Sequence, residues 1–252
     1  MKILDDILLF FKRRLMETIR QPMWVMSGLM TPLLYIVLFS PLLKNLANPP
    51  LGTAAVLDSF VPGILTILAF GSGMGAGWTI VWELQSGVIE RLRVSPASRF
   101  SILMGSVLMN VVSFLVPAII VIVVCSFFGF QIHFAGIAVL LLLLCLLTAI
   151  VSAWSCSMGL IFREIGTLAA VVTGLQLPLT LLSGVLLPVS LGPMWLRIIA
   201  HLNPLYYTVE ASRILAGGVI NSSETITAFT VIIPLMAVTL WWATGIFHKS
   251  VA

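Results

Sequence analysis

The longest stretch without a charged residue places the strongest constraint on the fold of this chain. Between Arg99 and Arg163 the sequence contains no Asp, Glu, Lys or Arg. Soluble domains average about 25% charged residues, whereas this chain of 252 residues has 9% charged and 60% hydrophobic residues. About 20 apolar residues cross the hydrocarbon core of a bilayer, so this stretch is long enough for two crossings. The sequence therefore predicts an all-α polytopic membrane protein.

Charged residues also delimit the other predicted spans, because a central Lys, Arg or Asp costs roughly 2.5–3.5 kcal/mol on insertion scales. The two spans within 100–162 are expected to separate at a short polar hairpin near 129–136, where Gln131 and His133 occur. The other predicted spans are 21–43, 59–82, 166–187 and 225–247. The prediction is one transmembrane domain over residues 1–252 with six transmembrane helices.

Residues 1–20 have the pattern of an amphipathic helix. Their charges are not confined to a short leader, as they would be in a cleavable signal peptide. One helical face carries Ile3, Leu4, Ile7, Leu8, Phe11, Leu15 and Ile19. The other carries most of Asp5, Asp6, Lys12, Arg13, Glu17 and Arg20. We expect this helix to lie in the membrane interface rather than to span it.

The region 188–224 is predicted to re-enter the membrane from one side. Residues 194–215 are apolar, but they include Arg197, Glu210 and Arg213, with Pro204 near the centre. Three formal charges would cost several kcal/mol in a helix facing lipid. We therefore predict two short helices that enter the membrane and return, with a break at Asn203–Pro204. Irregular backbone at such a break is tolerated where protein or water covers it.

The distribution of basic residues predicts the orientation. Six spans put both termini on one side, and placing them in the cytoplasm gives ten basic residues inside and three outside, as the positive-inside rule requires. The inside set is Lys2, Lys12, Arg13, Arg14, Arg20, Arg91, Arg93, Arg99, Arg163 and Lys249, and the outside set is Lys44, Arg197 and Arg213. This distribution explains the net charge of +4 without a nucleic-acid partner.

A short charged stretch, residues 83–99 (ELQSGVIERLRVSPASR), lies between two predicted spans on the cytoplasmic side. Its apolar residues recur at helical spacing, and Pro96 is expected to end the helix. Its polar faces carry Glu83, Glu90, Arg91 and Arg93. On spacing alone, the stretch is either an ordinary solvated loop or a surface helix that a soluble partner contacts.

Four glycines at 71–77 (GSGMGAG) are predicted to serve helix packing. The segment lacks the Lys-Ser/Thr ending of a phosphate-binding loop, and it lies in an apolar span. Gly71 with Gly75, and Gly73 with Gly77, form two small-xxx-small pairs that allow helices to approach closely. We find no nucleotide motif and no metal-ligand spacing, and three cysteines within apolar runs do not form a disulfide framework.

Two other functions fit the sequence less well. An intramembrane serine protease would need a Gly two residues before Ser183, where this chain has Leu181, and neither His201 nor His248 is placed to act as its base. An ion channel or ion-coupled secondary transporter is a stronger alternative. Such pathways usually contain intramembrane charges, and the predicted spans lack them in their interiors, which favours an apolar or amphiphilic cargo.

Two motifs on opposite sides of the predicted membrane match one known group. The first comprises Glu83, Gly87, Glu90, Arg91, Leu92, Ser95, Pro96 and Arg99. The second comprises Ser183, Gly184, Pro188, Pro193, Trp195, Leu196, Asn203, Pro204, Leu205, Tyr206, Tyr207 and Arg213. With these motifs the chain resembles the membrane subunit of a type-2 ABC exporter, the group of daunorubicin-resistance-type drug permeases and polysaccharide exporters. The resemblance covers essentially the full length.

The resemblance implies a permease without an ATPase domain of its own. Two such subunits, as a homodimer or with a second permease, would enclose the pathway in a bacterial inner membrane, and two separate ATPase subunits would bind ATP and Mg. The implied ATPase-coupling residues are Glu83, Gly87, Glu90, Arg91, Arg93, Pro96 and Arg99, with Arg163 and Glu164 as a second contact. The implied outer re-entrant gate comprises Gly184, Pro188, Pro193, Trp195, Asn203, Pro204, Glu210 and Arg213. Drug, lipid, peptide and glycan cargoes all remain open.

Overall fold

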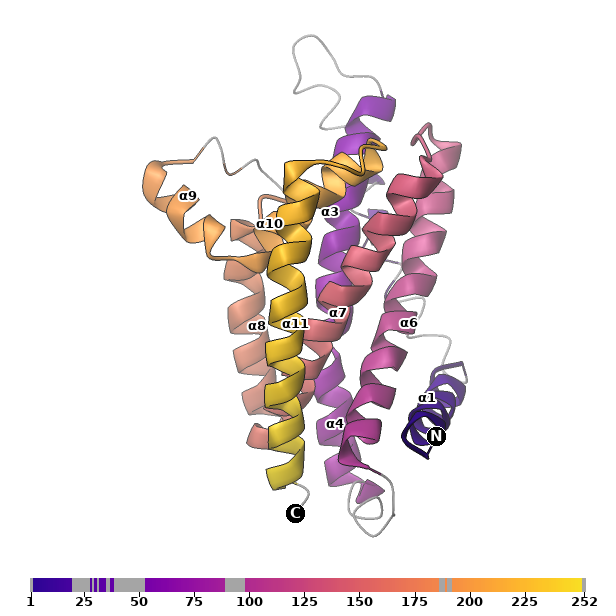
Figure 1. Ribbon diagram of the computed structural model, residues 1–252, viewed down its shortest axis with the longest axis vertical. Coiled ribbons are helices and arrows are strands. Elements are labelled where there is room, and N and C mark those ends of the chain that lie inside the picture. The colour runs from indigo at the N-terminus through magenta and orange to yellow at the C-terminus, as the bar shows by residue number, and fades with distance from the viewer. Residues whose placement is uncertain are drawn as a thin grey trace.

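Long helices running side by side make up most of the computed structural model (Figure 1). It describes residues 2–19, 28, 30, 32–34, 37–38, 53–88, 98–185, 189 and 192–250. The helices are α1 (Lys2–Ile19), α3 (Thr53–Met74), α4 (Ala76–Gln85), α6 (Arg99–Phe127), α7 (Phe134–Phe162), α8 (Ile165–Leu182), α9 (Met194–His201), α10 (Pro204–Ala216) and α11 (Ser223–Ser250). Every regular element within these residues is a helix, which confirms the all-α class.

Five helical segments of the described chain are long and apolar enough to cross a membrane. They are Phe60–Gln85, Phe100–Phe127, Phe134–Phe162, Ile165–Leu182 and Ser223–His248. They correspond to the second through sixth predicted spans. The first predicted span, 21–43, falls largely outside the described residues, so the count of six stays a prediction.

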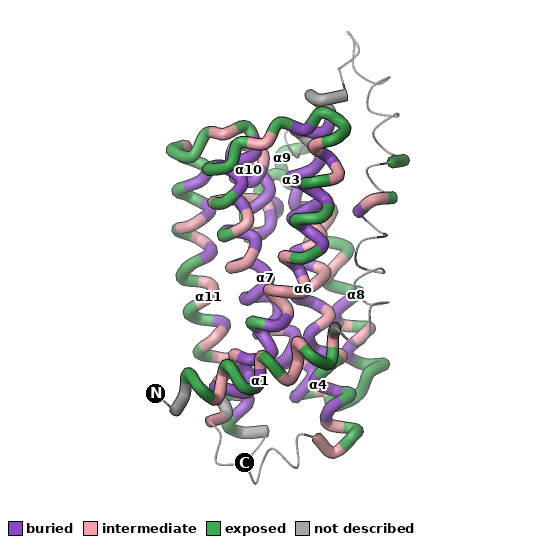
Figure 2. Tube along the Cα trace, turned by 90° about the vertical axis from the view of Figure 1, so that its right-hand side faces the viewer, coloured by how far each residue is buried: buried purple, intermediate pink, exposed green. Residues whose placement is uncertain are grey.

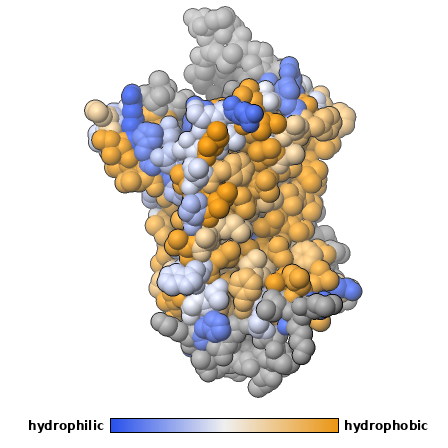
Figure 3. Space-filling model, viewed as in Figure 1, coloured by the Kyte–Doolittle hydropathy of each residue, from blue (hydrophilic) through white to orange (hydrophobic). Residues whose placement is uncertain are grey.

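Helix α7 forms the centre of the bundle, as expected for a helix of 29 residues without a formal charge. It packs against α3, α4, α6, α8, α10 and α11. The most hydrophobic part of α7 is 56% buried, close to the 61% of Phe60–Gln85 and well above the 11% of α8 and 22% of α11. The buried residues lie along the inside of the bundle (Figure 2), and hydrophobic side chains cover the middle of the outer face on the α11 side (Figure 3).

Two glycines bring α3 and α4 against α7. A Cβ atom at Gly73 would lie 2.7 Å from a side-chain carbon of α7, and one at Gly77 would lie 2.5 Å from the Ser155 carbonyl oxygen. By contrast, Gly71 has nothing within 4 Å, and Gly75 meets only carbonyl oxygens of its own segment. Only one of the two predicted glycine pairs therefore faces α7.

A side chain of α7 covers the break between α3 and α4 at Gly75. The Ser155 hydroxyl donates to the Met74 carbonyl at 2.5 Å and accepts from the Gly77 amide at 3.0 Å. A side chain that enters the backbone ladder in this way is a known cause of helix kinks. The two bonds satisfy backbone groups that would otherwise face an apolar interior.

The ends of the bundle differ in what they carry. At one end lie α1, the end of α4 and the C-terminal end of α11, and at the other lie α9, α10 and the hairpin between α6 and α7 (Figure 1). The hairpin occupies residues 128–133, where the sequence predicts it. Helices α9 and α10 meet at Leu202–Asn203, close to the predicted break. Their entry into the membrane stays a prediction.

We expect Gly77→Leu to lower the thermal unfolding midpoint of the detergent-solubilised protein. The new side chain would have to displace the backbone of α7. Overpacking costs about 1–3 kcal/mol, and each kcal/mol shifts the midpoint of a chain of this size by roughly 2–4 °C.

The matched control is Gly71→Leu on the same segment, because a Cβ at Gly71 has nothing within 4 Å. Equal losses in the two variants would show that close approach at Gly77 is not what makes the substitution costly.

Candidate functional site

The predicted coupling stretch is described at its two ends. Glu83 lies in the last turn of α4, and Gly87 follows that helix with a positive φ of 70°, a conformation that suits glycine. Arg99 is the first residue of α6. The predicted contacts Glu90, Arg91, Arg93 and Pro96, and the side chain of Arg99, lie outside the described residues.

Glu83 is buried within the protein and does not sit on the exposed face that the sequence predicts for the coupling stretch. Its exposed fraction is 3%. The Arg14 guanidinium of α1 donates to one carboxylate oxygen at 2.6 Å, and an Arg13 nitrogen lies 3.6 Å from the other. The helix of the second span therefore continues past its predicted end at Trp82, because α1 supplies the counter-charge.

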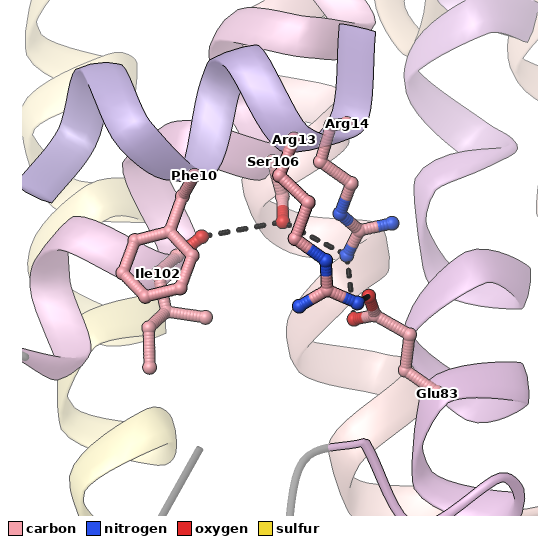
Figure 4. A pocket seen from close by; sticks show the side chains of 6 residues that line it. All are labelled: Phe10, Arg13, Arg14, Glu83, Ile102 and Ser106. Carbon is pink, nitrogen blue, oxygen red and sulfur yellow. Dashed lines mark hydrogen bonds and ion pairs between the residues drawn. The ribbon is translucent and has the colours of Figure 1, made fainter. Parts of the chain in front are cut away.

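Ser106 of α6 completes the cluster around Arg14. The same Arg14 nitrogen donates to the Ser106 hydroxyl at 3.2 Å, and that hydroxyl donates to the Ile102 carbonyl at 3.2 Å. Figure 4 shows the small pocket that these residues line together with Phe10 and Arg13. One guanidinium thus bonds to both helices that flank the coupling stretch.

The packing of α1 on α6 sets the position of Arg14. Phe10 is buried at the contact, and a Cβ atom at Gly105 of α6 would lie 2.6 Å from the Phe10 Cβ. Arg14 follows Phe10 by about one helical turn and Ile7 by about two, so the three share one face. That face points into the bundle, whereas Leu4 and Leu8 are exposed.

Arg14 and Ser106 are site residues that sequence reasoning missed. The amphipathic pattern of residues 1–20 places the neighbouring charges on the polar side and does not place Arg14 on either face. A signal was present, because Arg14 falls at helical spacing within the apolar face. A cation at such a position predicts a buried partner, since an unpaired buried charge is costly. Ser106 carries no comparable signal.

The predicted second contact, Arg163–Glu164, forms the turn between α7 and α8. Arg163 has φ of 56° and its Nε donates to the Leu160 carbonyl at 3.3 Å. The Glu164 carboxylate accepts from the Thr167 hydroxyl at 2.7 Å. Both residues are exposed, and Arg163 and Glu164 line no part of the Arg14–Glu83 pocket.

At the opposite end, Arg213 and Asn203 attach α10 to the end of α8. Arg213 donates to the Gly184 carbonyl at 2.8 Å and to the Val185 carbonyl at 3.2 Å. Its other terminal nitrogen lies 3.3 Å from the Glu210 carboxylate. Both carbonyls lie in the turn just beyond α8, so Arg213 joins α10 to that turn.

Asn203 satisfies the backbone at the break itself. Its side-chain oxygen accepts from the Leu205 amide at 3.1 Å, and its side-chain nitrogen donates to the Leu179 carbonyl at 2.7 Å. Pro204 begins α10, a position where its missing amide hydrogen costs nothing. The Asn-Pro pair thus ends one short helix, caps the next and binds α8.

The other predicted gate residues surround this attachment. Gly184 has φ of 77°, Pro193 immediately precedes α9, and Trp195 is 61% exposed. Pro188 lies outside the described residues.

Three aromatic rings meet at the corner between α9 and α10, a cluster that the sequence did not predict. The His201 and Tyr206 centroids are 4.9 Å apart in an edge-on arrangement, and those of Tyr206 and Tyr207 are 5.6 Å apart. The Tyr207 hydroxyl donates to the His201 carbonyl at 2.9 Å. Burial, reinforced by Glu210, raises the pKa of Tyr206.

Among the described residues, no group of three or more His, Cys, Asp and Glu side chains could hold a metal ion. The clusters at both ends instead join helices through charged side chains. The bonds of both clusters connect segments that are distant in the sequence.

Comparison with known proteins identifies the family. The ABC-2 type transporter family matches residues 5–216. The chain is 32% identical over 221 residues to the putative transport permease ycf38 of Cyanophora paradoxa, covering 84% of this chain and 74% of that protein. For the ycf38 permease of Porphyra purpurea, identity is 28% over 219 residues, with the same coverage of 84% and 74%.

The third relative is the daunorubicin resistance ABC transporter permease protein DrrB1 of Streptomyces coeruleorubidus. It is 22% identical over 199 residues, which cover 78% of this chain and 70% of that protein. These matches confirm the resemblance drawn from the two motifs. The chain therefore belongs to the ABC-2 type transporter family, as a multi-pass membrane permease that works with a separate ABC subunit carrying the ATPase activity.

Proposed function

We propose that this permease exports a hydrophobic or amphiphilic molecule, such as a drug, a lipid or a lipid-linked molecule, from the cytoplasm. The observation that carries the proposal is the position of formal charge. Asp58, Glu83, Glu224 and Lys249 lie towards the ends of their helices, and the spans in 100–162 and 165–182 contain no formal charge. Ion-coupled transporters usually carry ionisable groups within the membrane. A daunorubicin-resistance permease among the relatives supports a drug-like cargo.

The proposed assembly contains two copies of this chain as a homodimer and two copies of the ATPase. It lies in a bacterial inner membrane with both termini in the cytoplasm. In support, α1 and the C-terminal end of α11 lie at the same end of the bundle (Figure 2). Only 11% of the most hydrophobic part of α8 is buried within one chain. This leaves a large apolar face for lipid or for a second copy.

We assign ATPase coupling to the stretch 83–99, with Arg163 and Glu164 as a second contact. In support, the stretch leaves α4 through exposed Gln85 and Ser86, and Arg163 and Glu164 are exposed at the same end of the bundle. We assign the outer gate to α9 and α10, which Arg213 and Asn203 attach to the end of α8.

The first expectation concerns the source of energy. Purified permease alone should hydrolyse no ATP, because its sequence contains no nucleotide-binding motif. In proteoliposomes that also contain the cognate ATPase, ATP should drive export, with daunorubicin as the first test substrate. A hydrolysis-dead ATPase is the matched control and should abolish both hydrolysis and export. Transport by the isolated chain along an ion gradient would favour the secondary-transporter function instead.

The second expectation concerns orientation. In a background without the three native cysteines, Asn221→Cys should react with an impermeant maleimide in intact cells. Ser86→Cys and Ser250→Cys should react only after permeabilisation, because the positive-inside rule places both in the cytoplasm. Labelling of Ser250→Cys in intact cells would contradict the six-span arrangement with both termini inside.

The third expectation concerns the outer gate. Arg213→Leu should reduce export while ATPase binding persists, because it leaves two carbonyls at the end of α8 without their donor. An unsatisfied buried acceptor costs about 1–3 kcal/mol. Export and ATPase co-purification are the measurements.

Glu210→Ala is the matched control for Arg213→Leu. It removes only the partly exposed ion pair, and such pairs contribute about 0–1 kcal/mol. We expect near-normal export from Glu210→Ala. Normal export by the Arg213→Leu variant would show that Arg213 is a surface charge without a role in the gate.

A further inference from the structure

We propose that Arg14, Glu83 and Ser106 form a latch by which α1 positions the coupling stretch for the ATPase. The part of this inference that concerns the ATPase rests on the proposed function. In this scheme Glu83 is a positioning residue, and it makes no contact with the ATPase itself. This revises the role that the sequence predicts for Glu83, and it adds two residues outside both motifs.

The latch joins three helices close to the two described ends of the coupling stretch. Arg14 comes from α1, Glu83 from the last turn of α4, and Ser106 from about two turns into α6 (Figure 4). The Arg14 nitrogen lies 2.6 Å from the Glu83 carboxylate and 3.2 Å from the Ser106 hydroxyl. The coupling stretch leaves α4 just beyond Glu83 and returns at the start of α6. Arg14 therefore ties together the two helices from which the stretch emerges.

Arg14 provides the shorter and more buried of two charged contacts between α1 and α4. Apolar packing holds α1 chiefly on α6, through contacts such as that of Phe10 with Gly105. Loss of Arg14 would leave this packing in place, and only the longer contact of Arg13 with Glu83 at 3.6 Å would still join the end of α4 to α1. The latch is therefore separable from the docking of α1, which makes it testable.

The chemistry of the pair favours positioning over simple stabilisation. Buried ion pairs contribute little net stability compared with apolar groups of similar size, because both charges lose water. An Arg–carboxylate pair does impose direction, since the guanidinium is a rigid planar fork. The side chains of Arg14 and Glu83 are 12% and 4% exposed. A displaced α4 would leave two charges unpaired in a poorly hydrated site.

Arg13 provides a matched comparison within the same helix. Its side chain is 35% exposed, lies 3.6 Å from Glu83, and also pairs with Glu17 at 3.1 Å. Arg13→Gln and Arg14→Gln therefore remove the same charge from adjacent residues, but only the second removes the short buried bonds.

The first experiment measures amide hydrogen exchange in the purified permease, without ATPase or cargo. We expect Arg14→Gln and Glu83→Gln to speed exchange at 2–19 and 82–88 by about tenfold or more, because a charge-assisted bond contributes about that factor. Exchange in α7 should stay at the wild-type rate. The charge swap, Arg14→Glu with Glu83→Arg, should bring exchange back to within about threefold of wild type. Arg13→Gln should change exchange by less than about threefold.

The second experiment titrates the cognate ATPase subunit against the same variants in nanodiscs. The dissociation constant should rise about tenfold or more in both single variants and recover in the charge swap. Should the single variants fail to fold, Ser106→Ala removes only one bond of the latch, and we expect a smaller loosening of 2–19 from it.

Three results would overturn the latch. The first is a wild-type rate of amide exchange at 2–19 and 82–88 in Arg14→Gln. The second is an increase in Arg13→Gln as large as that in Arg14→Gln. The third is faster exchange throughout α7 in Arg14→Gln, which would mean global destabilisation. If wild-type permease binds no ATPase, the proposed function fails, and the exchange experiment still decides whether the latch exists.

Discussion

The absence of water inside the membrane is the constraint on which this structure depends, because every polar group there must find its partner within the protein. Hydroxyl groups of α7 meet this need beside α3, where Ser155 bonds at the break and Thr148 donates to the Ala69 carbonyl at 3.2 Å. Asn110 of α6 donates to the Ser106 carbonyl and the Ser152 hydroxyl at 2.9 and 3.0 Å. Among the described residues, no buried side-chain nitrogen or oxygen lacks a hydrogen-bond partner.

The same constraint explains which parts of the fold the sequence predicts well. Charge is so costly in hydrocarbon that gaps between charges locate the spans, and five of the predicted spans correspond to helices of the structure. The positions of charged residues misplace the end of a buried segment where a charge is buried with a partner. The predicted second span ends at Trp82, before Glu83, yet the helix continues to Gln85. The charge rule treats each charged residue as hydrated, and Arg14 makes that assumption wrong for Glu83.

The candidate site was harder to predict than the spans because its contacts join residues far apart in the sequence. Arg14 and Glu83 are 69 residues apart, and only the packing of α1 on α6 brings them together. Similarly, the four-residue spacing of glycines could not decide which pair faces a neighbour, and the structure has Gly73 and Gly77 against α7. Arg213 illustrates an intermediate case. Its i−3 partner Glu210 follows from helical geometry, whereas its carbonyl partners, Gly184 and Val185, lie in the turn beyond α8.

At each end of the bundle an arginine attaches one helix to a neighbouring segment, but the acceptors differ. Arg14 bonds to a buried carboxylate, which neutralises the charge and gives a strong, directional contact. Arg213 bonds to neutral carbonyls, and its counter-charge among the described residues is Glu210, whose side chain is 38% exposed. Opening the first attachment separates two buried charges, whereas opening the second leaves two neutral carbonyls without their donor and keeps the Arg213 cation beside Glu210 on the same helix. The α1 end is therefore built to hold its geometry, and the α9–α10 end can be displaced at lower cost.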